Sequence, residues 1–165
     1  MHDHLHDAHN GHNPHSLQAL AELAGKTMYA RDPASQALGI LLAEIRPGYA
    51  RMTMTVRPDM LNGHHSCHGG FIFMLADSAF AFACNSHNHN TVGAGCSIDY
   101  LAPGREGELL TAEASEQALA GKTGVYDVKV SNAEGRTIAL FRGKSHRVGG
   151  MVAEVVVQAT ATPAA

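Results

Sequence analysis

The 165-residue chain has no tryptophan, and aromatic residues make up only 5% of it. Charged residues are also scarce, at 16%, and the formal net charge is −3. This composition provides no strongly basic surface for nucleic acid or for an anionic membrane. Because 45% of the residues are still hydrophobic, we expect one folded domain with an aliphatic, alanine-rich core.

The sequence also lacks the patterns of secreted and membrane proteins. Its three cysteines are odd in number and form no C-x-x-C pair. No charged segment followed by an apolar one opens the chain, so no secretory signal is expected. The longest apolar run, residues 71–84, falls short of the roughly 20 residues that a membrane span needs. We therefore expect a cytoplasmic protein with reduced thiols and no membrane contact.

What the sequence does contain is one aspartate, Asp77, in the middle of that apolar run. A carboxylate among phenylalanine and alanine side chains loses much of its solvation energy unless a partner stabilises it. His68-Gly69-Gly70 precedes the run, and a helix that begins there has free amide N–H groups that attract negative charge. A helix start that binds an oxyanion, together with a desolvated carboxylate, suits attack on a carbonyl group. The structural alternative is an aspartate whose hydrogen bonds are satisfied by a neighbouring serine or by backbone.

Both ends of the chain differ in composition from its middle. Residues 1–15 contain six histidines and few hydrophobic residues, so we expect a disordered tail. Residues 16–150 are expected to form the domain, and residues 151–165 a flexible C-terminal tail. His64, His65 and Cys67 match no ordinary zinc spacing, so no metal site is predicted.

Hydrophobic periodicity predicts helices and strands between the tails. Helices are expected over residues 16–31, 33–38 and 69–86, and strands over residues 40–46, 49–57, 91–101, 109–119, 124–131 and 137–148. The helix over residues 69–86 is apolar on almost every side, so it must be buried. An antiparallel sheet wrapped around this central helix, in the α+β class, explains that burial.

The order of these elements resembles the hotdog fold, and several motifs resemble its acyl-CoA thioesterases of phenylacetate degradation, the PaaI type. The motifs are residues 62–70, 75–81, 98–104, 121–127 and 140–147, and the resemblance covers residues 27–150. It implies hydrolysis of aryl CoA thioesters, phenylacetyl-CoA and hydroxyphenylacetyl-CoA, to free acid and CoA in phenylacetate catabolism. It also implies that no cofactor takes part, since CoA belongs to the substrate.

The same resemblance implies roles for three residues. The backbone amide of Gly69 would bind the thioester carbonyl oxygen, and Asp77 would be the catalytic carboxylate. Asn62 would place substrate or water, although capping of its own loop is an equally good interpretation. Asp77 would act as a nucleophile or as a general base, and the residues alone do not decide between them.

Other candidates for the site are less strongly marked. Some relatives carry threonine or serine four residues after the carboxylate, where this chain has alanine, so Ser78 or Ser97 would have to substitute. Gly70 would permit close approach of the substrate. His68 would be a general base or, alternatively, a loop histidine that shapes the pocket. Three basic residues have two interpretations, as ordinary surface charges or as contacts to the CoA phosphates: Lys122, Arg142 and Lys144.

One departure from the family concerns acyl preference. The phenylacetate enzymes place an asparagine in their N-terminal helical segment, and Arg31 aligns with it here. This difference leaves the preferred acyl group open.

The spacing of Gly69 and Asp77 has a consequence for assembly. Eight residues of helix span about 12 Å, at roughly 1.5 Å per residue, so one thioester carbon cannot touch both groups of one chain. A twofold dimer with antiparallel helices brings Asp77 of one subunit level with Gly69 of the other. We therefore expect a homodimer with composite active sites, and the resemblance implies a homotetramer, a dimer of dimers.

Two other functions suit parts of the pattern. A hotdog hydratase or dehydratase acting on acyl-CoA or acyl carrier protein would need a histidine working beside the carboxylate, whereas His68 precedes the helix. A non-catalytic acyl-CoA-binding protein would not need Asp77 and Gly69 together.

Overall fold

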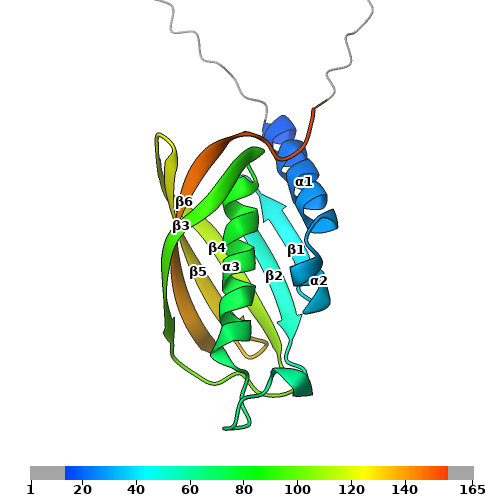
Figure 1. Ribbon diagram of the computed structural model, residues 1–165, viewed down its shortest axis with the longest axis vertical. Coiled ribbons are helices and arrows are strands. Elements are labelled where there is room, and N and C mark those ends of the chain that lie inside the picture. Colours follow the sequence, from blue (N-terminus) through cyan, green and yellow to red (C-terminus); the bar gives the residue numbers. More distant parts are fainter. Residues whose placement is uncertain (1–13, 156–165) are drawn as a thin grey trace, which may run out of the picture.

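The computed structural model describes residues 14–155, which form an antiparallel sheet curved around one long helix (Figure 1). The helices are α1 (Pro14–Ala30), α2 (Pro33–Ala37), the 3₁₀ turn η1 (Pro58–Met60) and α3 (Gly69–Asn85). The strands are β1 (Leu41–Arg46), β2 (Tyr49–Thr55), β3 (His89–Tyr100), β4 (Leu109–Ala120), β5 (Thr123–Asn132) and β6 (Thr137–Met151). They lie in the order β1-β2-β4-β5-β6-β3, which confirms the predicted α+β class and the central helix.

The predicted element boundaries differ from the structure mainly at the two ends. Helix α1 begins at Pro14, two residues before the expected start at Ser16. Strand β6 continues to Met151, and Ala153 is buried because the Asn88 side chain bonds its backbone N and O at 2.8 and 3.0 Å. The expectation of a flexible tail from residue 151 is therefore wrong as far as Ala153. Residues 1–13 and 156–165 lie outside the described residues, so the remaining tail predictions stay predictions.

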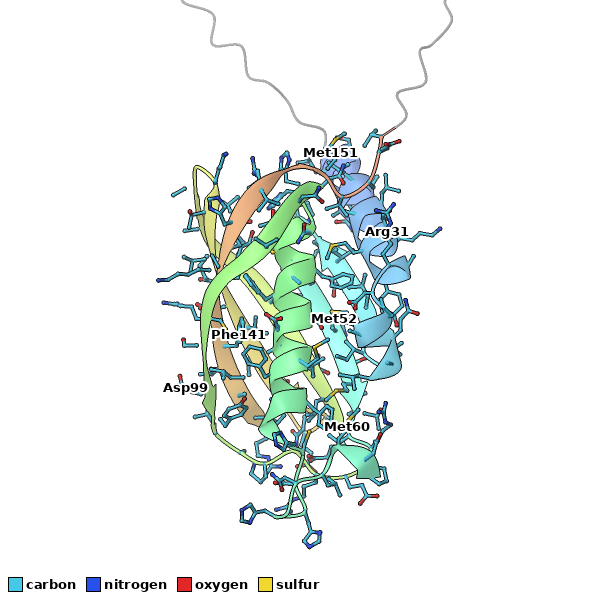
Figure 2. All side chains as sticks on the ribbon, viewed as in Figure 1. Arg31, Met52, Met60, Asp99, Phe141 and Met151 are labelled. Carbon is cyan, nitrogen blue, oxygen red and sulfur yellow. The ribbon has the colours of Figure 1, made fainter. Side chains whose placement is uncertain are left out.

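Helix α3 lies in the concave face of the sheet because its side chains fill the core. Phe80 packs between Tyr126 of β5 and Phe141 of β6, with ring centroids 5.6 and 5.7 Å away. The ring lies so close to β6 that a Cβ on Gly143 would come within 2.8 Å of it. Met52 of β2 belongs to the same buried cluster as Phe141 (Figure 2).

One side of this core is left uncovered in the single chain. The residues facing that side of α3 are exposed or only half-buried: Gly70, Phe73, Met74, Asp77 and Ala81. Strand β3 lies at the edge of the sheet, and its residues 92–97 are all exposed. A long free strand edge beside an uncovered apolar helix stripe is a template for pairing with another chain. The expectation that α3 is buried on every side therefore fails within one chain.

Among the described residues, no helix is both long and apolar enough to span a membrane.

Candidate active site

Gly69 and Asp77 line two separate hollows of the chain. The Gly69 hollow, about 420 Å³, is an open depression bordered by the 62–67 loop, the start of α3, and the end of β3 with the segment after it. The Asp77 hollow, about 310 Å³, lies between the middle of α3 and the edge strand β3, and is lined by Asp77, Phe80, Ala81, Gly93, Gly95 and Cys96. Neither hollow contains both groups, as the helix length requires.

The start of α3 leaves one amide N–H available. His68 caps the helix, because its Nδ1 accepts a hydrogen bond from the Gly70 amide at 2.9 Å. The Phe71 amide bonds the His68 carbonyl oxygen at 2.9 Å. Within residues 14–155 the Gly69 amide has no acceptor of its own. It therefore fits the predicted carbonyl-binding donor, whereas the Gly70 amide is already engaged.

Tyr100 of β3 closes the other side of Gly69. Its hydroxyl donates to the Gly69 carbonyl oxygen at 3.0 Å, and a Cβ on Gly69 would meet its ring at 3.2 Å. A side chain at position 69 would thus be in tight contact with Tyr100. The sequence analysis did not single out Tyr100, although it lies within one of the quoted motifs.

His68 fits its structural interpretation better than that of a general base. Its Nδ1 is occupied by the helix cap, and its ring packs edge-on to Phe71 with centroids 6.3 Å apart. It does not line either hollow. The structure therefore gives His68 the role of a helix cap, and its role as a general base stays a prediction.

Asn62 shapes the loop before α3 and also faces the Gly69 hollow. Its Oδ1 accepts from the His64 amide at 2.9 Å and from the Ser66 amide and hydroxyl at 3.3 Å. This confirms the loop-capping interpretation for the side-chain oxygen. The Nδ2 group has no protein partner within residues 14–155, and Asn62 lines the Gly69 hollow. A contact of Nδ2 with substrate or water stays a prediction.

Asp77 is half-buried and has no hydrogen bond or ion pair among the described residues. Burial raises the pKa of its carboxyl group, since the charged form loses solvation. The neighbouring serine does not compensate it, because the Ser78 hydroxyl lies 3.0 Å from that of Ser35 in α2. The structural alternative of a satisfied aspartate is thus wrong for the single chain. Unpaired, partly desolvated carboxylates are typical of active sites.

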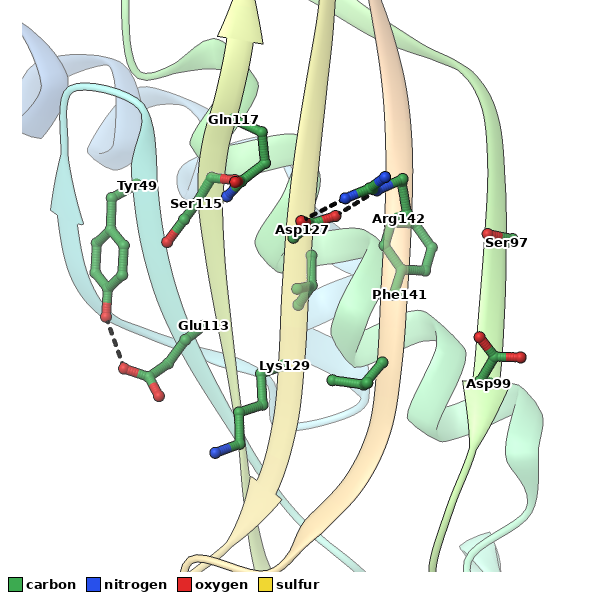
Figure 3. Close-up of a pocket in the computed structure, with 12 residues that line it drawn as sticks. Tyr49, Ser97, Asp99, Glu113, Ser115, Gln117, Asp127, Lys129, Phe141 and Arg142 are labelled. Carbon is green, nitrogen blue, oxygen red and sulfur yellow. Dashed lines mark hydrogen bonds and ion pairs between the residues drawn. The ribbon is translucent and has the colours of Figure 1, made fainter.

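Neither serine proposed as a helper has a hydrogen bond to Asp77 among the described residues. Ser78 is buried between α3 and α2, so its role as a substrate contact is wrong. Ser97 lies on the outer face of the sheet, in a groove of about 620 Å³ that faces away from α3 (Figure 3). The alternation of side chains along β3 sends this residue to the face opposite the two hollows.

The basic candidates also lie away from the two hollows. Arg142 lines the outer groove and forms a bidentate ion pair with Asp127 (Figure 3). Its Nε and Nη2 donate to the two carboxylate oxygens at 2.6 and 2.7 Å. Lys144 is exposed on the same strand, and Lys122 is exposed in the turn between β4 and β5. Contacts of these residues with CoA phosphates stay predictions. Arg31 is exposed after the end of α1 (Figure 2).

Known proteins resemble this chain in sequence and in fold. The profile of the thioesterase superfamily matches residues 64–139. Acyl-coenzyme A thioesterase PaaI of Escherichia coli is 51% identical over 125 residues, which cover 76% of this chain and 89% of that protein. The solved structure of the E. coli PaaI protein, from the phenylacetic acid degradation operon, matches with a TM-score of 0.81 and 49% identity, over 82% of this chain and 98% of that one. A hypothetical thioesterase of Streptococcus pneumoniae, solved with coenzyme A, matches with a TM-score of 0.65 and 27% identity, over 68% of this chain and 90% of that one.

Proposed function

Since the chain belongs to the PaaI-type acyl-CoA thioesterases of the thioesterase superfamily, which have the hotdog fold, we propose that it hydrolyses phenylacetyl-CoA and hydroxyphenylacetyl-CoA to free acid and CoA. The observation that carries the proposal is that one helix holds both a Gly69 amide without an acceptor and an Asp77 carboxylate without a partner. Family membership favours hydrolysis over the hydratase and the non-catalytic binding protein. The proposed physiological role is release of CoA during phenylacetate breakdown.

In the proposed reaction, the thioester carbonyl oxygen accepts a hydrogen bond from the Gly69 amide. Asp77 takes a proton from a water molecule as its oxygen adds to the carbonyl carbon. The negative charge that develops on the carbonyl oxygen is stabilised by the helix start. The tetrahedral intermediate then collapses, the carbon–sulfur bond breaks, and CoA leaves as its thiol by taking the proton that Asp77 gained, which restores the carboxylate. Burial raises the pKa of Asp77 in the single chain, which makes its carboxylate a stronger proton acceptor.

Isotope labelling tests whether Asp77 acts as a nucleophile whose anhydride is opened at the aspartyl carbon. A single turnover in water enriched with ¹⁸O should place the label in the released acid and none in the Asp77 side chain. Label in the Asp77 carboxylate, found by mass spectrometry of the peptide, would instead show a mixed anhydride and a nucleophilic carboxylate.

We propose that each site combines Gly69 of one subunit with Asp77 of its partner. The free edge of β3 and the uncovered stripe of α3 offer the surface on which a second copy would pack. A twofold axis perpendicular to α3 would make the two helices antiparallel and bring the Gly69 hollow of one subunit to the Asp77 hollow of the other. Association of two such dimers into a tetramer remains a prediction from the resemblance.

Subunit mixing tests the composite site directly. Asp77→Asn and Gly69→Pro subunits are each expected to be inactive, but a heterodimer of the two keeps one intact site. After unfolding and refolding of an equal mixture, about a quarter of the wild-type activity should return, because half of the dimers are mixed and each has one of two sites. No recovery in a mixture shown to contain heterodimers would mean that each site lies within one chain.

The substrate class is tested by a panel of thioesters. Release of CoA thiol from phenylacetyl-, hydroxyphenylacetyl-, benzoyl- and fatty acyl-CoA is measured under identical conditions. We expect the highest kcat/KM for the two phenylacetyl thioesters. Faster hydrolysis of the fatty acyl thioesters would contradict the aryl assignment while leaving the thioesterase activity in place.

A further inference from the structure

Tyr100 joins the end of strand β3 to the start of helix α3. Its backbone pairs with Ala139 of β6, and its hydroxyl donates to the Gly69 carbonyl oxygen at 3.0 Å. The side chain also lines the Gly69 hollow. Burial raises the pKa of the Tyr100 hydroxyl, so this group stays protonated and able to donate at neutral pH. The first residue of α3 is thus tied to a strand that the sheet holds in place.

This tie acts on the residue that carries the free amide. Gly69 lies between two planar peptide units, one with the His68 carbonyl and the Gly69 N–H, the next with the Gly69 carbonyl and the Gly70 N–H. The first unit is held by the bond from the Phe71 amide to the His68 oxygen at 2.9 Å. The second is held at its N–H by His68 Nδ1 and at its carbonyl by Tyr100. Because glycine is conformationally free and helix ends fray, the direction of the Gly69 N–H depends on both units being fixed.

Strand β3 also borders the other half of the proposed site. It lines the Asp77 hollow, and its free edge is the surface on which a second copy would pack. A tie between β3 and Gly69 therefore fixes the carbonyl-binding amide relative to the strand that meets the partner. We propose that Tyr100 is a positioning residue, whose hydroxyl keeps the Gly69 N–H directed at the thioester carbonyl oxygen. This rests on the proposed function, in which that N–H stabilises the developing negative charge.

The first test removes the hydroxyl and keeps the ring. Tyr100→Phe should lower kcat for the best thioester of the panel by about five- to tenfold, the effect of one lost hydrogen bond, and change KM by less than about twofold. Tyr29→Phe is the matched control, because the Tyr29 hydroxyl also donates to a backbone carbonyl, that of Ile40, at 2.9 Å. Tyr29 lines neither hollow, so its replacement should leave kcat within about a factor of two of the wild-type value.

A double-variant cycle distinguishes positioning of the amide from direct contact with the substrate. In Gly69→Pro the N–H is absent, so Tyr100 has no donor left to position. Adding Tyr100→Phe to Gly69→Pro should therefore lower kcat by less than about twofold. A further loss as large as in the wild-type background would show that Tyr100 acts independently of the Gly69 amide, and would overturn the proposal.

Other results would overturn it as well. An unchanged kcat in Tyr100→Phe, or an equal loss in Tyr29→Phe, would show that the Tyr100 hydroxyl has no specific effect on the reaction. Loss of the dimer in Tyr100→Phe, seen by light scattering, would show that the hydroxyl serves the subunit interface instead. Failure of the proposed function looks different, because Gly69→Pro would then keep the wild-type kcat or no thioester of the panel would be hydrolysed.

Discussion

Two carboxylates border helix α3, and they have opposite surroundings. Glu116 of β4, beyond the C-terminal end of the helix, accepts from the Tyr126 hydroxyl at 2.8 Å and lies 2.7 Å from Nε2 of His87. Asp77, in the middle of the helix, is half-buried and has no partner among the described residues. Both lie on the same apolar core. Only Glu116 has hydrogen-bond partners among the described residues.

The difference separates a structural carboxylate from a reactive one. The Glu116 cluster ties β4, β5 and the turn after α3 together, because each of its members comes from a different element. Asp77 contributes no such connection in the chain, and its charged form is destabilised by burial. Loss of Asp77 should therefore affect chemistry and spare the fold, whereas loss of the Glu116 contacts should affect the fold and spare chemistry.

The largest expected effect comes from Asp77→Asn. Removal of the general base should lower kcat by about 1,000-fold, within the range measured for such groups. The dimer should survive, and the free energy of unfolding should not fall, because an unpaired carboxylate has been replaced by a neutral amide of the same shape. Thiol release from phenylacetyl-CoA, light scattering and urea unfolding are the measurements.

Asp99→Asn provides the control for this change. Asp99 is an exposed aspartate of β3 that lies in the outer groove (Figure 3). Its replacement should change kcat by less than about a factor of three, as surface substitutions away from a site usually do. Turnover near the wild-type rate in Asp77→Asn would show that Asp77 does not act in the mechanism. Asp77 would then not differ from Glu116 as a reactive carboxylate from a structural one.

The next effect sharpens the role of the helix start. Gly69 is the first residue of α3, a position where proline is tolerated because the amide there has no partner within the helix. Gly69→Pro should therefore keep the helix but remove the N–H donor, with a loss of roughly 100-fold in kcat. Gly69→Ala is the control, since it brings the same Cβ close to Tyr100 and keeps the N–H. Equal losses in both variants would attribute the effect to crowding of Tyr100 rather than to the missing donor.

The Glu116 side of the comparison is tested by Tyr126→Phe. The buried hydroxyl donates to a carboxylate, so its loss should lower the free energy of unfolding by about 1–2 kcal/mol while kcat/KM stays within a factor of about three. Tyr49→Phe removes a similar bond, to Glu113 at 3.0 Å, in an exposed position and should change stability by less than about 0.5 kcal/mol. A large loss of activity without loss of stability in Tyr126→Phe would make the Glu116 cluster part of the active site.

The central helix and the succession of strands along the chain could be predicted from sequence because they depend on local patterns, whereas the place of β3 at the edge of the sheet, beside β6, depends on pairing between distant residues. The apolar run over residues 69–86 predicted α3 to within one residue, and the Asp32-Pro33 pair predicted the capped start of α2. Ser78 was misplaced because adjacent residues on a helix point in directions about 100° apart, and its partner is Ser35 in another element. The side-chain clamp of Asn88 on Ala153 joins residues far apart in sequence, so no local pattern indicated it.

The smallest expected effect concerns the pH dependence of stability. Burial raises the pKa of Asp77 in the folded chain, so the folded state binds this proton more tightly than the unfolded state does. Its contribution to stability is fully present below the unfolded pKa, about 3.9, and is lost as the pH rises through the higher folded pKa. Asp77→Asn does not titrate. The stability of the variant relative to the wild type should therefore increase with pH across that range and then become constant, in urea unfolding at one fixed protein concentration. A decrease instead would mean that the partner subunit's helix start lowers the pKa of Asp77 in the dimer, and then Asp77, like Glu116, would have a stabilising partner.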